Sequence, residues 1–159
     1  MVKNCTFADC QRLRSVRFAP GTLEIGSEGH AEDIDWGAFE ASGVRRVTMP
    51  SSLRALGWHA FAYCDELSRV ELPEGLRIIG RGTFLQSRLG EVKIPASVWK
   101  ICPEAFLDCW YLEKVEFAPR SRLETLGERA FEMTKITEFM APQSLREIGD
   151  GAFANCYEL

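Results

Sequence analysis

Phenylalanine recurs along the chain in one short, repeated setting. It is the second residue of the pentapeptides TFADC, AFEAS, AFAYC, TFLQS, AFLDC, AFEMT and AFANC, at Phe7, Phe39, Phe61, Phe84, Phe106, Phe131 and Phe153. Recurrence at a nearly fixed period is the primary signature of a repeat architecture. The hydrophobic pattern therefore predicts stacked copies of one unit of about 23 residues.

A short alternation of apolar and polar residues follows each of the first six pentapeptides. The alternations are LRSVRF (13–18), VRRVTM (44–49), LSRVEL (67–72), LGEVKI (89–94), LEKVEF (112–117) and ITEFMA (136–141). A period of two is typical of a strand with one buried face. A proline then ends strand pairing, because it lacks a backbone donor. These prolines are Pro20, Pro50, Pro73, Pro95, Pro119 and Pro142.

A second apolar pair follows the proline in five of the repeats. The pairs are Leu53 and Leu56, Leu76 and Ile79, Val98 and Ile101, Leu123 and Leu126, and Leu145 and Ile148. Glycine then supplies a permissive turn before the next Phe, at Gly57, Gly80, Gly127 and Gly149. One short unit cannot bury both apolar sets alone, so the units must stack and share a core. The pattern predicts a solenoid, because the Pro-closed alternations would interrupt the helices of a bundle.

The repeat phrase resembles that of a known family. The segments LSRVELPEGLRIIGRGTF and LGEVKIPASVWKICPEAFLDC follow the pattern L-x-x-V-x-I-P-x-x-L-x-x-I-G-x-x-A-F-x-x-C of the BspA-type leucine-rich repeat family. The resemblance covers nearly the whole chain, with Cys102 as a departure at the turn glycine. It implies an α/β leucine-rich repeat solenoid. A parallel β-sheet forms its concave face, and short strands, turns or 3-10 or helical segments form its convex side.

We expect one leucine-rich repeat domain over residues 1–159, with about six full repeats and partial ends. A loop insertion near 21–33 adds about nine residues relative to the neighbouring repeats. Neither end carries the polar capping segment that solenoids need. The chain is therefore predicted to be a fragment of a longer array, or to self-associate through its ends.

Composition excludes several classes of function. The net charge of −4 lacks the basic excess that nucleic-acid binding requires. The chain shows no signal peptide and no run of eighteen apolar residues, so we expect no membrane segment in it. Its histidines are His30 and His59, and it contains no H-E-x-x-H, G-x-S-x-G or C-x-x-C motif. We therefore expect no enzyme, no cofactor and no metal site.

Four of the six cysteines occupy one position in every second repeat, namely Cys10, Cys64, Cys109 and Cys156. Equivalent positions two repeats apart lie roughly 10 Å from each other, too far for a disulfide or a shared metal ion. We expect buried thiols. The intervening repeats carry Ser42, Ser87 and Thr134 and have a loop shorter by one residue. Our hypothesis is that the hydroxyl binds backbone in the tighter turn, while the thiol packs beneath the longer one.

The outward residues of the predicted strands form two columns. One column reads Ser15, Arg46, Arg69, Glu91, Lys114 and Glu138, and the other reads Arg17, Thr48, Glu71, Lys93, Glu116 and Met140. From the third strand onward the charges alternate, which favours a cross-strand ladder. The first three strands leave arginine charge unbalanced. This indicates a docking site for an acidic protein segment or a sulfated glycan, or else a solvated face partly neutralised by the acidic insertion.

Tryptophan offers a second candidate contact. Trp36 and Trp58 take the same position in adjacent units, where they serve either as interface anchors or as packing between repeats. The candidate partner-binding residues are therefore Arg17, Arg46, Arg69, Thr48, Glu71, Glu91, Lys93, Trp36 and Trp58.

Family resemblance favours a non-catalytic protein-binding or adhesion module of a larger cell-surface or secreted protein. The alternative is an intracellular protein-interaction scaffold, which unpaired thiols fit better. A cytoplasmic location thus stays open.

Overall fold

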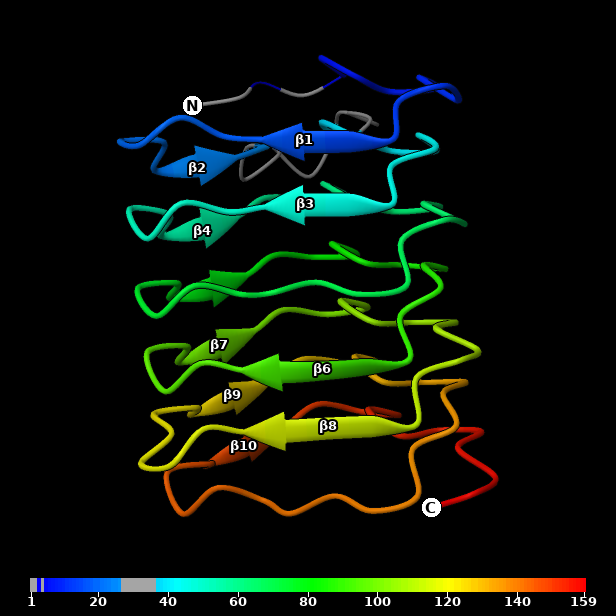
Figure 1. Ribbon diagram of the computed structural model, residues 1–159. Helices are drawn as coiled ribbons and strands as arrows, with labels where there is room; N and C mark the ends of the chain where they lie inside the picture. The colour runs from blue at the N-terminus through cyan, green and yellow to red at the C-terminus, as the bar shows by residue number, and fades with distance from the viewer. Residues whose placement is uncertain (1–2, 4, 27–36) are drawn as a thin grey trace.

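The chain winds into a solenoid whose turns stack from the N-terminal to the C-terminal end (Figure 1). The computed structural model describes residues 3, 5–26 and 37–159. One side, here called the front face, carries β1 (Ser15–Arg17), β3 (Arg46–Thr48), β6 (Glu91–Ile94) and β8 (Lys114–Phe117). Strand β1 pairs with β3 and β6 pairs with β8, both in parallel. The segments 67–72 and 136–141 run in the same column without forming strands (Figure 1).

The second apolar pairs form a second parallel sheet, here called the back sheet. Its strand order is β10-β9-β7-β5-β4-β2. The strands are β2 (Glu24–Ile25), β4 (Ala55–Leu56), β5 (Ile78–Ile79), β7 (Lys100–Ile101), β9 (Thr125–Leu126) and β10 (Glu147–Ile148). The parallel-stranded solenoid predicted from the repeat is confirmed. The α/β class and the helical segments are wrong, because the described residues form strands and turns without a helix. No helix among them is long and apolar enough to cross a membrane.

The turn around each phenylalanine explains why no helix forms there. The second residue after every Phe of the repeat has a left-handed backbone, as at Ala41 (φ 55°) and Tyr63 (φ 56°). Such a residue ends a right-handed helix. The amides bond instead to the next turn of the solenoid: Phe61 donates to the Thr83 carbonyl at 2.8 Å, and Tyr63 to the Leu85 carbonyl at 2.7 Å. The phenylalanine corner is therefore a third ladder of backbone bonds between turns.

The phenylalanine rings stack into one column inside this corner. The seven ring centroids follow one another at 5.0 to 5.9 Å, with neighbouring planes inclined by at most 19°. Five of them are fully buried, namely Phe39, Phe61, Phe84, Phe106 and Phe131. The apolar residues of the front face and the back sheet pack against this column and complete the core.

The turn glycines allow the backbones of consecutive turns to approach closely, and they do not adopt an unusual backbone angle. None of Gly80, Gly127 and Gly149 has a positive φ, contrary to the permissive turn expected. A Cβ at Gly80 would lie 2.5 Å from the Leu56 carbonyl oxygen, and one at Gly127 would lie 2.3 Å from the Pro103 nitrogen. Both contacts are shorter than van der Waals distance. Glycine is therefore needed because the backbones of consecutive turns nearly touch.

The insertion begins later than the sequence indicated. Residues 24–25 form β2, which pairs in register with β4, and Ile25 is fully buried. This part of the segment 21–33 is thus a regular back-sheet strand. The pattern was missed because Thr22 stands where the other repeats have the first apolar residue of the pair, and Leu23 takes the outward position of Arg54.

The phenylalanine column predicts a graded effect of truncation. Phe84→Ala should lower the free energy of unfolding by about 3–5 kcal/mol, because the ring is fully buried between two others. The matched variant Phe7→Ala should lower it less, because that ring is 37% exposed and stacks on Phe39 alone. Urea unfolding monitored by circular dichroism measures both. Equal losses would contradict the role of the stacked interior.

The left-handed turns predict a stabilising substitution. Ala41→Gly should raise the free energy of unfolding by about 0.5–1 kcal/mol, because it relieves a side chain held at φ 55°. The control Ala154→Gly, at a position without positive φ, should lower stability through added chain entropy. Thermal melts of the two variants compare these effects. A lower melting temperature for Ala41→Gly would refute the argument.

Candidate binding surfaces

The front face places the predicted outward residues in the expected register. Arg46 lies opposite Ser15 and Thr48 opposite Arg17 in the β1–β3 pair. Glu91 lies opposite Lys114 and Lys93 opposite Glu116 in the β6–β8 pair. All of these residues are exposed, and so are Arg69 and Glu71 in the segment between the two pairs. The structure therefore brings the front-face candidates onto one surface.

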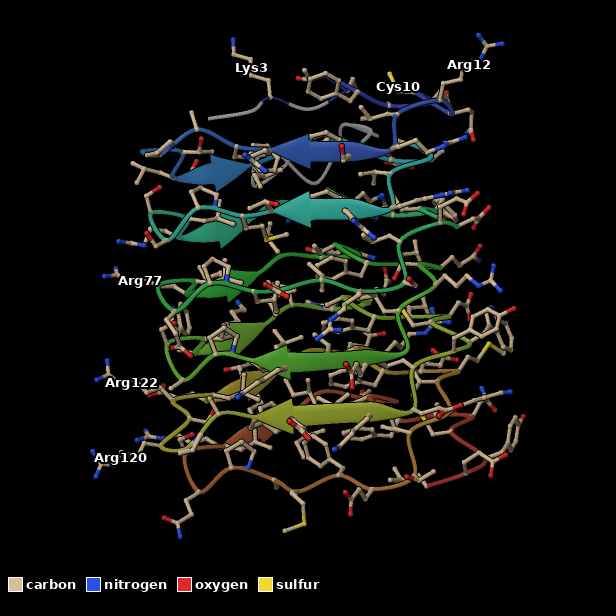
Figure 2. All side chains as sticks on the ribbon, viewed as in Figure 1. Lys3, Cys10, Arg12, Arg77, Arg120 and Arg122 are labelled. Atoms are coloured by element: carbon tan, nitrogen blue, oxygen red, sulfur yellow. The ribbon has the colours of Figure 1, made fainter. Side chains whose placement is uncertain are left out.

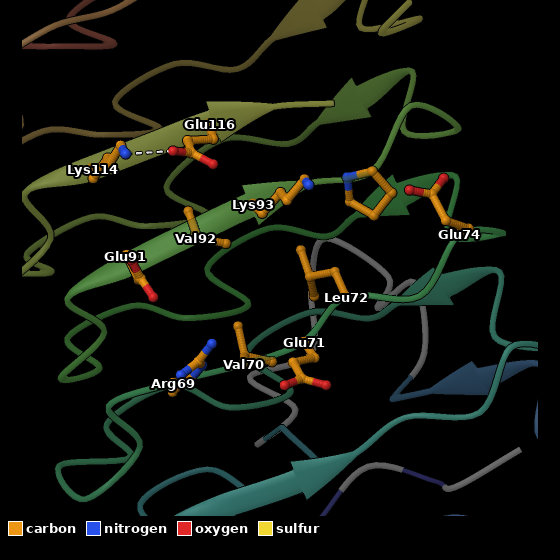
Figure 3. Close-up of a pocket in the computed structure, with 11 residues that line it drawn as sticks. Arg69, Val70, Glu71, Leu72, Glu74, Glu91, Val92, Lys93, Lys114 and Glu116 are labelled. Atoms are coloured by element: carbon orange, nitrogen blue, oxygen red, sulfur yellow. Dashed lines mark ion pairs between the residues drawn. The ribbon is translucent and has the colours of Figure 1, made fainter. Parts of the chain in front are cut away.

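The C-terminal half of this surface holds mixed charges. A hollow of about 370 Å³ lies between the two halves and is lined by Arg69 and Glu71 as well as by charged residues of β6 and β8 (Figure 3). The Lys114 ammonium pairs with Glu116 on the same strand, where a ladder across strands was expected. This bond raises the pKa of Lys114 and lowers that of Glu116. Lys93 on the neighbouring strand adds a smaller lowering of the Glu116 pKa through its charge. Charge in this half is thus largely balanced within the face.

The N-terminal half differs, because its arginines are left without anionic partners. Arg17, Arg46 and Arg69 are exposed and form no ion pair with any described residue. Their neighbour Arg45 does find one: its guanidinium lies 3.2 Å from Glu66 and holds the pKa of that carboxyl below its ordinary value. The neutralising acidic insertion considered above falls mainly on residues 27–36, outside the described residues.

Of the two tryptophans selected from the sequence, the structure describes Trp58. Trp36 lies outside the described residues. Trp58 is half-buried and lines a hollow of about 700 Å³ together with Trp99, which the sequence reasoning did not select. Trp99 follows the buried Val98 and precedes β7, so it takes an outward position. The alternation of the back sheet was the signal that could have identified it.

His59 and Glu40 form a local contact in the described part of the chain. His59 Nδ1 lies 3.8 Å from the Glu40 carboxylate, which also accepts a 2.6 Å bond from the Gly37 amide. Glu40 therefore holds a turn in place. Within residues 3, 5–26 and 37–159, no group of three or more His, Cys, Asp or Glu side chains could hold a metal ion. His30 lies outside the described residues.

The cysteine column forms no disulfide, as expected. Cys64 and Cys109 are fully buried, as predicted, whereas Cys10 and Cys156, at the two ends of the column, are only partly buried. Each thiol does more than pack. Cys64 Sγ donates to the Phe39 carbonyl at 3.1 Å, and Cys109 Sγ donates to the Phe84 carbonyl at 3.1 Å. The thiol of a longer loop thus binds the backbone of the preceding turn.

The hydroxyls of the shorter loops form hydrogen bonds with these thiols. Ser87 Oγ lies 3.4 Å from Cys109 Sγ, and Ser42 Oγ lies 3.7 Å from Cys64 Sγ. The hypothesis that the hydroxyl binds backbone is right for Thr134, which donates to the Phe131 carbonyl at 2.9 Å. It is wrong for the two serines, whose recorded partner is a thiol. A hydroxyl and a thiol from adjacent turns therefore form one hydrogen-bonded unit, which explains their alternation.

Burial of these thiols makes the stability of the folded protein depend on alkaline pH. It raises the pKa of Cys64 from 9.0 to about 11 and that of Cys109 to about 12, against the smaller lowering by their serine partners. The unfolded thiols lose their protons first, so this stability is fully present below pH 9. It is lost as the pH rises through the folded pKa values.

We therefore predict that the protein loses roughly 1 kcal/mol per buried thiol between pH 8 and pH 10. The double variant Cys64→Ala/Cys109→Ala is the control, because it retains every other group that titrates in this range. Urea unfolding at both pH values measures the difference. The same loss in the variant would mean that these thiols do not carry the effect.

Comparison with known proteins identifies the repeat. A family model described as BspA type Leucine rich repeat region matches residues 32–159 in six copies. A leucine-rich repeat protein of T. pallidum is 29% identical with a TM-score of 0.86, over 99% of this chain and 70% of that one. A leucine-rich repeat protein from Bacteroides ovatus is 26% identical with a TM-score of 0.82, over 100% of this chain and 45% of that one.

A further solved structure carries a cellular location in its description. A leucine rich cell surface protein from Faecalibacterium prausnitzii is 27% identical with a TM-score of 0.71, over 92% of this chain and 38% of that one. The chain thus spans less than half the length of two of these three proteins. No curated protein matches it.

Proposed function

Because the chain belongs to the BspA-type leucine-rich repeat family, we propose that it is a non-catalytic protein-binding and adhesion module of a larger cell-surface or secreted protein. The observation that carries this proposal is the set of exposed, unbalanced arginines on the front face, Arg17, Arg46 and Arg69. A guanidinium binds carboxylates through a planar fork of donors. The partner is therefore a protein segment rich in aspartate and glutamate.

The surrounding face suits such a partner. Thr48 lies beside Arg17 and adds a hydroxyl, while Glu71, Glu91 and Lys93 continue the surface toward the self-balanced half. An acidic segment is attracted by the arginines and repelled by the glutamates beyond them, so the charges also set its position.

Two of the cysteines fit an extracellular location as well as they fit an intracellular scaffold. Cys64 and Cys109 are enclosed in the core, and burial keeps them protonated at neutral pH. Protonated, enclosed thiols resist oxidation in any compartment. The description of the Faecalibacterium prausnitzii protein as a cell surface protein supports the proposal that this chain is part of a cell-surface or secreted protein.

Binding to poly-L-glutamate tests the front face. The double reversal Arg46→Glu/Arg69→Glu should weaken binding by about tenfold or more and reduce its salt dependence, because it replaces attraction by repulsion. The matched control Arg77→Glu/Lys100→Glu makes the same charge change on the back sheet and should leave this binding in place. Biolayer interferometry at several salt concentrations measures both. Unchanged binding by the front-face variant would overturn the proposed site.

A further inference from the structure

The back sheet carries a second surface, independent of the front face. Its outward side chains at one repeated position are Arg54, Arg77, Trp99, Glu124 and Arg146. The backbone joins them directly: the Arg77 amide donates to the Arg54 carbonyl at 2.8 Å, and the Trp99 amide to the Arg77 carbonyl at 3.0 Å. Each side chain therefore lies about one strand spacing, roughly 4.8 Å, from the next.

Trp99 stands between two open hollows of this surface. On one side, a hollow of about 700 Å³ is lined by Trp58, Ile78 and Lys100 as well as Trp99. On the other, Trp99 shares a hollow of about 560 Å³ with Arg77, Arg122 and one exposed carboxylate, Glu124. The Trp99 side chain is 40% exposed and Trp58 is half-buried, so both indoles are accessible from solvent. The surface is thus an aromatic groove with cationic margins.

Three cations of this groove are available to a ligand. Arg77, Lys100 and Arg122 come from successive turns and form no ion pair with any residue in the described ranges. Figure 2 shows Arg77 and Arg122 projecting outward from the same edge of the solenoid. The nearby Arg81 differs, because Glu104 binds it through two bonds of 2.8 and 3.1 Å. The cations of the groove therefore outnumber its exposed carboxylate, Glu124, on a chain whose net charge is −4.

We propose that this groove, defined by Trp58, Arg77, Trp99, Lys100 and Arg122, binds a linear sulfated polysaccharide. The apolar face of a sugar ring packs against an indole, and sulfate esters bind guanidinium and ammonium groups. A cation on each of three successive turns matches a polymer that carries anionic groups on successive sugar residues. The open, shallow form of the groove admits a chain that continues past both ends of the site.

An acidic peptide fits this surface less well. Peptides commonly bind a sheet by adding a strand to an open edge. Strands β4, β5 and β7 under the groove are each paired on both sides, so they present no such edge. The sheet offers side chains alone, and these are an aromatic pair with separated cations. This combination recognises rings that bear charged groups.

Heparin binding tests the proposal. Arg77→Glu/Lys100→Glu and, separately, Trp99→Ala should each weaken heparin binding by about tenfold or more in calorimetry. The front-face variant Arg46→Glu/Arg69→Glu should bind heparin as the unsubstituted chain does. This control separates a failure of the front-face protein-binding site from a failure of the groove on the back sheet. Chemically desulfated heparin should bind weakly. Circular dichroism and the melting temperature confirm that each variant is folded.

Three outcomes would overturn the proposal. Heparin binding that survives the charge reversal on the back sheet would place the ligand elsewhere. If the front-face variant weakened heparin binding equally, the binding would be explained by nonspecific charge attraction. Poly-L-glutamate that competes fully with heparin, with the same loss on Trp99→Ala, would assign the groove to an acidic polypeptide instead.

Discussion

Every part of this protein depends on the direct stacking of one turn of the solenoid on the next. Backbone amides at three places in the turn donate to the carbonyls of the neighbouring turn, and this holds equivalent residues within about one strand spacing of each other. The phenylalanine column is the apolar counterpart, with rings 5.0 to 5.9 Å apart. Close stacking also requires glycine where the backbones approach most nearly, as at Gly80.

The same stacking aligns the equivalent residues of successive turns and so creates the surfaces of the protein. A residue type that recurs at an outward position becomes a column, and the chemistry of that column depends on what the successive repeats place there. The front face balances its charge in the β6–β8 half through Lys114 and Glu116 and leaves arginines unbalanced at the other end. The back sheet interrupts an arginine column with Trp99 and Glu124. Both candidate binding surfaces are therefore breaks in a regular pattern.

Stacking also gives the cysteines their role. A thiol in one turn donates to a phenylalanine carbonyl in the turn before it, and a hydroxyl of that preceding turn reaches the same sulfur. The longer and shorter loops alternate because each supplies one member of this unit. The burial of Cys109 follows from a packing arrangement rather than from redox chemistry.

The sequence by itself determined the repeat, the front-face register and the alignment of four cysteines in one column, because these follow from which residues recur at a fixed period. Only the tertiary structure decided what lies between them. The two-residue strands of the back sheet are too short for periodicity to identify, and bonds between turns make them. The left-handed turns beside Phe61 and its equivalents carry ordinary residues such as Tyr63 and give no sequence signal, so the sequence left 3-10 or helical segments open beside turns, and the structure has turns alone. The groove around Trp99 joins Trp58, Lys100 and Arg122 across several turns, and only stacking brings such distant residues together.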